Sequence, residues 1–224
     1  MKKLNLTLHC GSHEATMEDV RQVETPQPTE SWCPIGHAEL VDSVLNTLGG
    51  SGLRVVEEAH AIWQGGNRYF GAFQLANGDN RDDYALVVGL RNSHDKSFPA
   101  GLACGSGVFV CDNLAFSGEI RLSRKHTVRI RQDLPRLITT AVGKLGSMKV
   151  TQDQRIEAYK GYAVTDPQAH DVVIRSLDVG GCKVTRLPDV LKEWRRPSHE
   201  EFAPRTAWSL FNCFTEAAKG LNVS

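Results

Sequence analysis

The sequence predicts a single α+β domain over residues 1–224, with an N-terminal helix, an antiparallel meander of three to four strands, and a helical C-terminal half. Two observations carry this prediction. Between residues 53 and 92, three apolar runs alternate with turn-forming residues, as neighbouring antiparallel strands do. Beyond residue 133, apolar residues recur every three or four positions between helix-capping and helix-ending residues.

The N-terminal part, residues 1–36, is expected to be extended, because residues 22–36 contain three prolines and few apolar side chains. Proline disfavours helix in the residue before it. Residues 37–120 form the helix-plus-strand half. Its helix is predicted from the helical spacing of Leu40, Val44 and Leu48, and Gly49-Gly50 supply a C-terminal stop.

The strands are expected to follow this helix directly. The runs 53–63 and 68–76 flank Gln64-Gly65-Gly66-Asn67, a good hairpin turn. The run 84–92 is apolar almost throughout, which favours a central strand. A glycine-rich loop over 100–107 then leads to a fourth candidate strand at 108–113.

The second half, residues 121–224, is expected to be helical. An apolar stripe runs from Leu134 to Leu145. A second helix is expected to begin with an N-cap at Asp166-Pro167 and to stop at Gly180-Gly181. A short helix from Leu187-Pro188 to Trp194 follows. A capping box of Ser198 with Glu201 precedes the last helix, at about 202–219, which is expected to bury Trp208, Phe211 and Phe214.

Charge is balanced over the chain but divided between its halves. Residues 1–120 hold 8 Lys+Arg and 15 Asp+Glu, a net −7, whereas residues 121–224 hold 18 and 11, a net +7. The most basic stretch, 121–136, could bind a polyanion, or it could pack on the acidic half or simply be solvated. The nucleic-acid-binding candidates are Arg91, Lys96, Arg121, Arg124, Lys125, Arg129 and Arg131.

The densest polar cluster, Arg91 to Ser97, follows the third predicted strand. His94 beside Asp95 could act as a base with its orienting carboxylate, and Arg91 with Lys96 could hold a phosphate. The alternative is a hydrogen-bonded turn, which Asn, Ser and Asp favour. Cys111 could also pair with His94 as a nucleophile, but the sequence favours a buried structural cysteine, because one Cys and one His in separate segments match by chance in most proteins.

Two Cys/His pairs near the N-terminus have spacings that zinc sites use. They are Cys10 with His13 and Cys33 with His37, and the alternative is that these are ordinary surface and core residues. We expect no metal and no cofactor. The sequence contains no phosphate-binding glycine–lysine loop, no dinucleotide fingerprint and no hydrolase motif.

Location is predicted from what the sequence lacks. No window approaches the length of a membrane span, and the N-terminus has no apolar core of a signal peptide. We therefore expect a cytoplasmic protein that does not contact membranes. The six scattered cysteines are expected to be reduced thiols.

Several stretches together resemble one protein family. They are TLHCGSH, PIGHAEL, NRYFGAFQL, GLRNSHDKSFPAGLACGSGVFVCDNLAFSG and RTAWSLFNCFTE. Over about residues 7–219 the chain resembles the phage- and plasmid-related family catalogued as domain of unknown function 932. Members of that family are typically carried by mobile elements, so the resemblance implies a role in DNA metabolism or in interplay with the host.

Three functions remain open from the sequence. The first is non-enzymatic nucleic-acid binding in DNA recombination or replication, including single-strand annealing by fold-level analogy, with single-stranded DNA as partner and a homo-oligomer as the assembly. The second is an oligomeric interaction protein that acts on a host factor. The third is an enzyme with its site around His94, Asp95 and Lys96.

Overall fold

The structure is a computed structural model that describes residues 13–76, 86–106 and 120–218. Contacts between residues group the chain into two compact units, one ending at Lys149 and the other beginning at Val150. The boundary falls inside helix α4 (Leu145–Gly161), and each unit is described here by itself. That both units belong to one domain, with a division between halves at residue 120, stays a prediction of the sequence.

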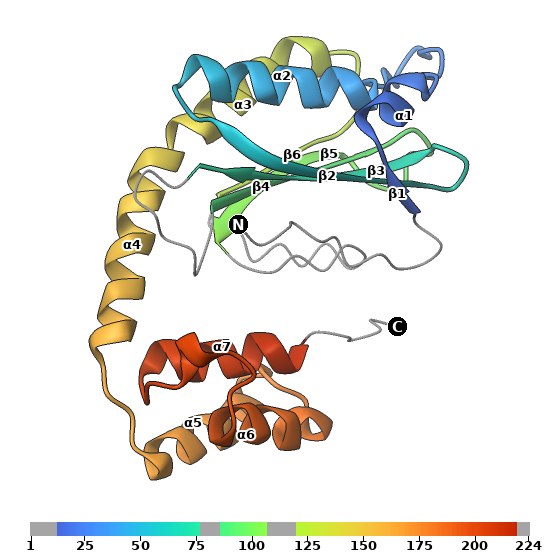
Figure 1. Cartoon of the computed structure of the whole chain (residues 1–224). Helices are drawn as coiled ribbons and strands as arrows, with labels where there is room; N and C mark the ends of the chain where they lie inside the picture. The colour runs from blue at the N-terminus through green and yellow to red at the C-terminus, as the bar shows by residue number, and fades with distance from the viewer. Residues whose placement is uncertain (1–12, 77–85, 107–119, 219–224) are drawn as a thin grey trace. The chain divides into compact units, whose positions relative to one another are not determined.

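The first unit is built on one antiparallel sheet whose six strands follow one another in chain order (Figure 1). The α+β class is confirmed, and the meander has six strands where three to four were predicted. Residues 64–67 form the hairpin turn as expected, since Trp63 pairs with Arg68 across it. The strands are β1 (His13–Ala15), β2 (Val55–Trp63), β3 (Arg68–Leu75), β4 (Leu86–Ser93), β5 (Ala100–Ser106) and β6 (Ile120–Arg124).

The unpredicted strands lie where local sequence signals are weak. Residues 100–106 were expected to be a glycine-rich loop, but they form β5, in which Leu102 pairs with Leu90 on one side and Leu122 on the other. Ladder hydrogen bonds on both sides outweigh the low strand propensity of glycine and alanine. Strands β1 and β6 occupy parts that were predicted as extended or helical. The candidate strand at 108–113 lies outside the described residues.

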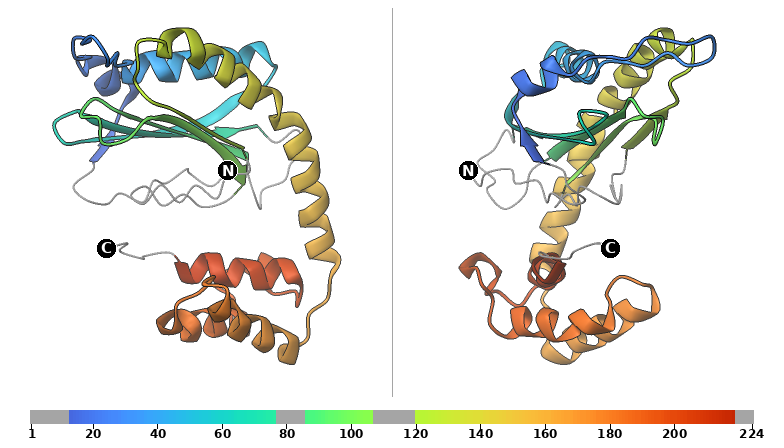
Figure 2. Two further views of the ribbon diagram at one scale, coloured as in Figure 1. Left: turned by 180° about the vertical axis from the view of Figure 1, so that it is seen from behind. Right: turned by 90° about the vertical axis from the view of Figure 1, so that its right-hand side faces the viewer.

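Three helices belong to the first unit: α1 (Met17–Gln22), α2 (His37–Gly50) and α3 (Ile130–Gly143). The predicted first helix is confirmed as α2, and the predicted apolar stripe as α3. Helices α2 and α3 lie side by side over one face of the sheet (Figure 2). Helix α1 was not predicted; it begins after Thr16, whose hydroxyl accepts a hydrogen bond from the backbone N–H of Asp19.

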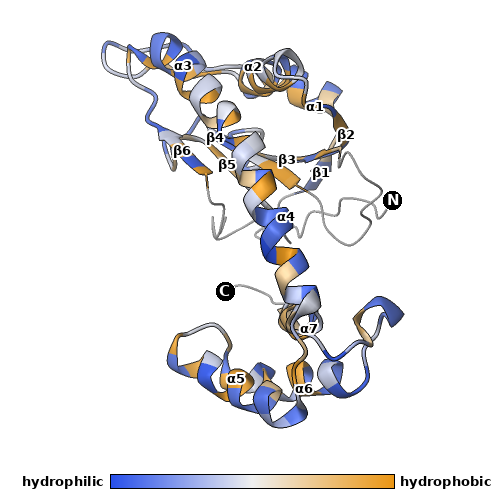
Figure 3. Cartoon of the chain, turned by 90° about the vertical axis from the view of Figure 1, so that its left-hand side faces the viewer, coloured by the Kyte–Doolittle hydropathy of each residue, from blue (hydrophilic) through white to orange (hydrophobic). Residues whose placement is uncertain are grey.

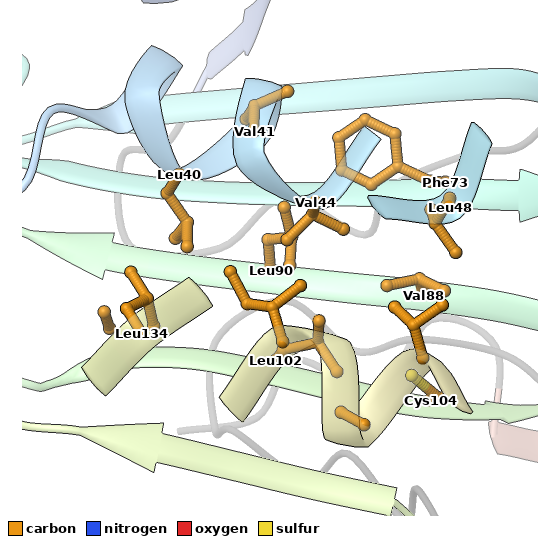
Figure 4. Close-up of a cluster of buried hydrophobic side chains, with 14 of the residues drawn as sticks. Leu40, Val41, Val44, Leu48, Phe73, Val88, Leu90, Leu102, Cys104 and Leu134 are labelled. Atoms are coloured by element: carbon orange, nitrogen blue, oxygen red, sulfur yellow. The ribbon is translucent and has the colours of Figure 1, made fainter. Parts of the chain in front are cut away.

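The main core lies between these helices and the sheet. Leu40, Val44 and Leu48 of α2 point toward Val88 and Leu90 of β4 (Figure 4). All five side chains are at most 1% exposed. Such burial of large apolar side chains supplies the main favourable term in folding. The spacing that predicted α2 is therefore the spacing of its buried stripe.

Residues between these inward positions point to the opposite face of the sheet, because side chains alternate along a strand. Ala61, Phe70 and Ala72 are also buried on that face. Arg91 lies on it too, half-buried, between Leu90 and Asn92, which face the helices. The first unit therefore has buried positions on both faces of its sheet.

The second unit consists of helices α5 (Asp166–Asp178), α6 (Leu187–Arg195) and α7 (Ala207–Ala218), with 3₁₀ turns at Val184–Arg186 and Glu200–Phe202. A separate core holds Trp194, whose indole N–H donates to Asp166 at 2.9 Å. The predicted helix starts at Asp166 and Leu187 are confirmed. The other buried members of this core are Val164, Ala169, Val173, Val190, Leu210, Cys213 and Ala217.

Three details of the second unit differ from the prediction. The N-cap of α5 is Thr165, one residue before Asp166. Ser198 does not cap a helix, because its hydroxyl and N–H both bond to Glu193. Phe211, expected to be buried in the last helix, is 47% exposed.

Helix α4 was not predicted, because it has no clear apolar stripe. Figure 3 shows hydrophilic and hydrophobic residues interspersed along it. Within the described residues, no helix combines the length and apolar character needed to cross a membrane.

Candidate functional site

A cluster of buried polar side chains holds the extended segment before α2 against the sheet. The carbonyl of Ile35 accepts hydrogen bonds from Asn92 Nδ2 at 2.7 Å and from His94 Nε2 at 3.0 Å. The N–H of the same residue donates to Nδ1 of His126 at 3.3 Å. Side chains from β4, the residue after it and the loop after β6 thus satisfy both backbone groups of Ile35.

His37 completes this cluster at the start of α2. Its ring stacks on that of His94, with centroids 3.9 Å apart. Asn92 Nδ2 donates to Nδ1 of His37 at 2.9 Å, so Nε2 carries the proton and donates to the carbonyl of Gly66 at 2.9 Å. Both nitrogens of His37 therefore have partners in its neutral form.

Burial keeps these histidines neutral. It lowers the pKa of His37 from 6.5 to about 3, and the neighbouring His94 lowers it further, against the carbonyl of Gly66. Burial likewise lowers the pKa of His126 to about 4 and depresses the pKa of His94. A base that acts near neutral pH needs a pKa near that pH, so these rings are suited to structure rather than proton transfer.

The side chain of Asp95 has partners other than His94. It bonds to Arg68 Nε at 2.7 Å and accepts from the N–H of Ser97 at 3.0 Å. Burial opposes ionisation of Asp95, but the bonds to Ser97 and Arg68 hold its pKa below its ordinary value. Lys96 lies 4.8 Å from the ring centroid of Trp32. The described part of 91–97 shows the hydrogen bonds of a turn and no bond between the side chains of His94 and Asp95.

The zinc and thiol candidates are placed only in part. Cys10 and Cys111 lie outside the described residues. His13 is exposed on β1, Cys33 is half-buried and free, and His37 is bonded through both nitrogens. Among the residues that the structure describes, no group of three or more potential ligands is placed to hold a metal ion.

Two of the basic candidates are engaged within the first unit. Arg124 Nη2 lies 2.7 Å from Asp133 Oδ2 and also bonds to Thr127. Arg131 pairs with Glu39 of α2. Part of the basic stretch therefore packs against the acidic half, which was one of the two readings of the sequence.

The other basic residues of this region leave one helix face strongly positive. Arg129 and Lys144 occupy the N-cap and C-cap positions of α3, and Arg136 lies between them at an exposed position of the helix. Lys125 is exposed in the loop before the helix. We call Lys125, Arg129, Arg136 and Lys144 the α3 basic face. The sequence did not single out Arg136 and Lys144, although their near-helical spacing from Arg129 was a usable signal.

The segment that carries this face holds only one acidic residue in its sequence. Residues 121–149 hold 8 Lys+Arg and 1 Asp+Glu, a net +7. The single acid is Asp133, which Arg124 already pairs. Residues 150–224 hold 10 of each sign and are neutral, so the excess charge of the second half belongs entirely to the segment that includes β6 and α3.

Comparison with protein-family models, with curated proteins and with solved structures gives no match for this chain. Membership of the phage- and plasmid-related family stays a prediction from the resembling stretches.

Proposed function

We propose that this protein binds nucleic acid through the α3 basic face, by contacts to phosphates, in the DNA recombination or replication of a mobile element. The observation that carries the proposal is a row of exposed cations in a segment whose single acid, Asp133, is already paired with Arg124. Arg129 and Lys144 are 15 positions apart, so the row extends over about 22 Å of helix. A phosphate backbone presents negative charge at regular intervals that such a row can follow.

Contacts of this kind do not read base sequence. Lysine and arginine side chains on an exposed helix surface reach phosphate oxygens, and specificity requires contacts to base edges. Several exposed side chains near these cations are polar: Gln132, Thr139, Thr140 and Ser147. We therefore expect binding with little sequence preference, as annealing or replication proteins require.

The test is fluorescence anisotropy of a labelled single-stranded oligonucleotide, with a duplex of the same sequence for comparison. We expect the triple variant R129Q/R136Q/K144Q to bind at least tenfold more weakly than the natural chain, since about three phosphate contacts are lost. The matched control K192Q/R195Q/R196Q removes the same charge from exposed positions on and just after α6 and should bind nearly normally. Equal loss in both variants, or no binding by the natural chain, would overturn the proposal.

One further observation favours a second function, an oligomeric interaction protein. Eight of the nine large hydrophobic side chains that are exposed in the described residues lie at position 150 or later. Val179 is 82% exposed and Val184 is 69% exposed. Exposed apolar side chains of this kind can contribute to an interaction surface where they form a continuous patch. Light scattering with and without an oligonucleotide distinguishes this function, which requires a mass above 24.7 kDa together with no binding of the oligonucleotide.

A further inference from the structure

Arg91 differs from the other half-buried arginines, because no carboxylate among the described residues pairs with it. Its one described side-chain interaction is with the ring of Phe98, whose centroid lies 5.5 Å from the guanidinium carbon. The other three donate to aspartates: Arg68 to Asp95, Arg124 to Asp133 and Arg186 to Asp189.

A missing side chain on the neighbouring strand makes room for Arg91. Gly101 of β5 pairs with Arg91 in the ladder. A Cβ atom at Gly101 would lie 2.9 Å from Nε and 3.0 Å from Cγ of the arginine, closer than van der Waals contact allows. Glycine at this position therefore lets the arginine side chain lie directly over the backbone of β5.

The same arrangement leaves the cation without full compensation. Burial lowers the pKa of Arg91, which means that its charge has lost part of its hydration. Contact with an aromatic face replaces only a fraction of that loss. No hydrogen bond of its guanidinium is described, and its nitrogens are not among the fully buried unpartnered atoms, so these N–H groups reach the surface where an acceptor can approach.

We infer that Arg91 is an oxyanion site that binds a phosphate group through the planar fork of its guanidinium. A guanidinium binds phosphate through two parallel hydrogen bonds. The contact with Phe98 restricts where the guanidinium can lie before a ligand binds. Trp63 lies beside Phe98, with ring centroids 6.3 Å apart, and offers an apolar wall to the group that carries the phosphate. The ligand class is a free phosphate or a small phosphorylated molecule such as a nucleotide.

This site is separate from the α3 basic face. Arg91 points to the sheet face opposite the one that α2 and α3 cover. No residue of the α3 basic face takes part in it, so oligonucleotide binding and phosphate binding can fail independently.

The experiment is a titration of the isotope-labelled full chain with inorganic phosphate, followed through the Nε–Hε resonance of Arg91. We expect a saturable shift of that resonance. R91M should abolish saturable binding, as followed by calorimetry, and R91K, which keeps the charge but loses the fork, should bind roughly ten- to hundredfold more weakly. G101A should also weaken binding, because the new methyl group displaces an arginine that is still present. R54M is the control, since it removes an exposed arginine at the opposite end of β2 from Trp63.

A second arm replaces phosphate by thymidine 5′-monophosphate. Tighter binding of the nucleotide than of phosphate identifies a nucleotide as the ligand, and equal binding identifies the phosphate group alone. The inference is overturned if the Arg91 resonance shows no saturation at about 10 mM of either compound. It is equally overturned if R54M weakens binding as much as R91K does, because the effect would then be one of net charge.

Discussion

The rings of His37 and His94 lie parallel, with an interplanar angle of 4° and a centroid separation of 3.9 Å. Two imidazoles in this arrangement can be neutral together, but two imidazolium ions would repel each other in a site with little water. Tyr69 also stacks on His37, with ring centroids 5.4 Å apart, and brings no negative charge to offset such repulsion. The stack therefore couples the folded state to the neutral form of both rings.

The stability of the first unit should fall in acid. The folded-state pKa values of His37 and His126 are about 3 and about 4, both below 6.5, so the unfolded chain binds more protons below pH 6.5. The stabilisation that comes from keeping these histidines neutral is complete above pH 6.5. It is lost as the pH falls toward their folded-state pKa values, at up to about 1.4 kcal/mol of unfolding free energy per pH unit for each histidine. Urea denaturation from about pH 4.5 to 7.5 measures this slope.

Two variants separate this effect from general acid sensitivity. H126Q should make the slope shallower, because one titrating group is removed while the glutamine oxygen can still accept from the N–H of Ile35. H13Q removes an exposed histidine of β1 and should leave the slope unchanged. A free energy of unfolding that does not vary between pH 5 and 6.5 would contradict the prediction.

Asn92 should be among the most sensitive polar positions. Its side chain is fully buried and donates to both the carbonyl of Ile35 and Nδ1 of His37. Asn92→Ala leaves two buried acceptors with fewer donors, and we expect a loss of about 2–4 kcal/mol in the free energy of unfolding. Asn46→Ala, at an exposed position of α2, should change it by less than about 0.5 kcal/mol. Similar effects at both positions would show that the buried network contributes little.

The described cysteines should differ in how fast their thiols react in the folded protein. Burial raises the pKa of Cys104 to about 12 and that of Cys213 to about 11, so neither forms appreciable thiolate at pH 8. Maleimide labelling with peptide mapping should modify the half-buried Cys182 in the folded protein, but Cys104 and Cys213 only after denaturation. C182S should remove labelling at this position and leave that of the half-buried Cys33 unchanged. Labelling of Cys104 at the rate of Cys182 would contradict its place in the core.

The salt dependence of the oligonucleotide binding constant should report how many phosphates the protein contacts. Four contacts from the α3 basic face correspond to a slope of about −2.8 in a plot of log K against log salt for a single strand. Affinity should therefore fall about 50-fold between 50 and 200 mM salt. R129Q/R136Q/K144Q should reduce the slope to about −0.7, whereas a slope unchanged by these substitutions would place the contacts elsewhere.

Much of the first unit could be predicted from local patterns. Leu40, Val44 and Leu48 are spaced for one helix face, and that face is the one buried in α2. The turn at 64–67 contains Gly65 and Gly66, both at positive φ, which glycine adopts without strain. These features depend on residues only a few positions apart, so they can be predicted from the sequence.

Strand β5 shows where local patterns fail. Its residues include glycine and alanine, which by themselves favour a loop, and its strand conformation depends on pairing with β4 and β6. The strands that pair with β5 are separate segments of the chain, and the intrinsic strand propensity of residues 100–106 does not depend on them.

The candidate sites were likewise predictable in part from the sequence and in part only from the tertiary structure. By itself, the sequence determined the fold class, the excess of positive charge after residue 120 and the polar character of 91–97. Only the tertiary structure decided that Arg131 pairs with Glu39 across 92 residues, that Asn92 reaches Ile35 across 57, and that Arg91 has no described carboxylate partner. Charge and periodicity are properties of composition and spacing, whereas pairing and burial depend on which distant segments the fold brings into contact.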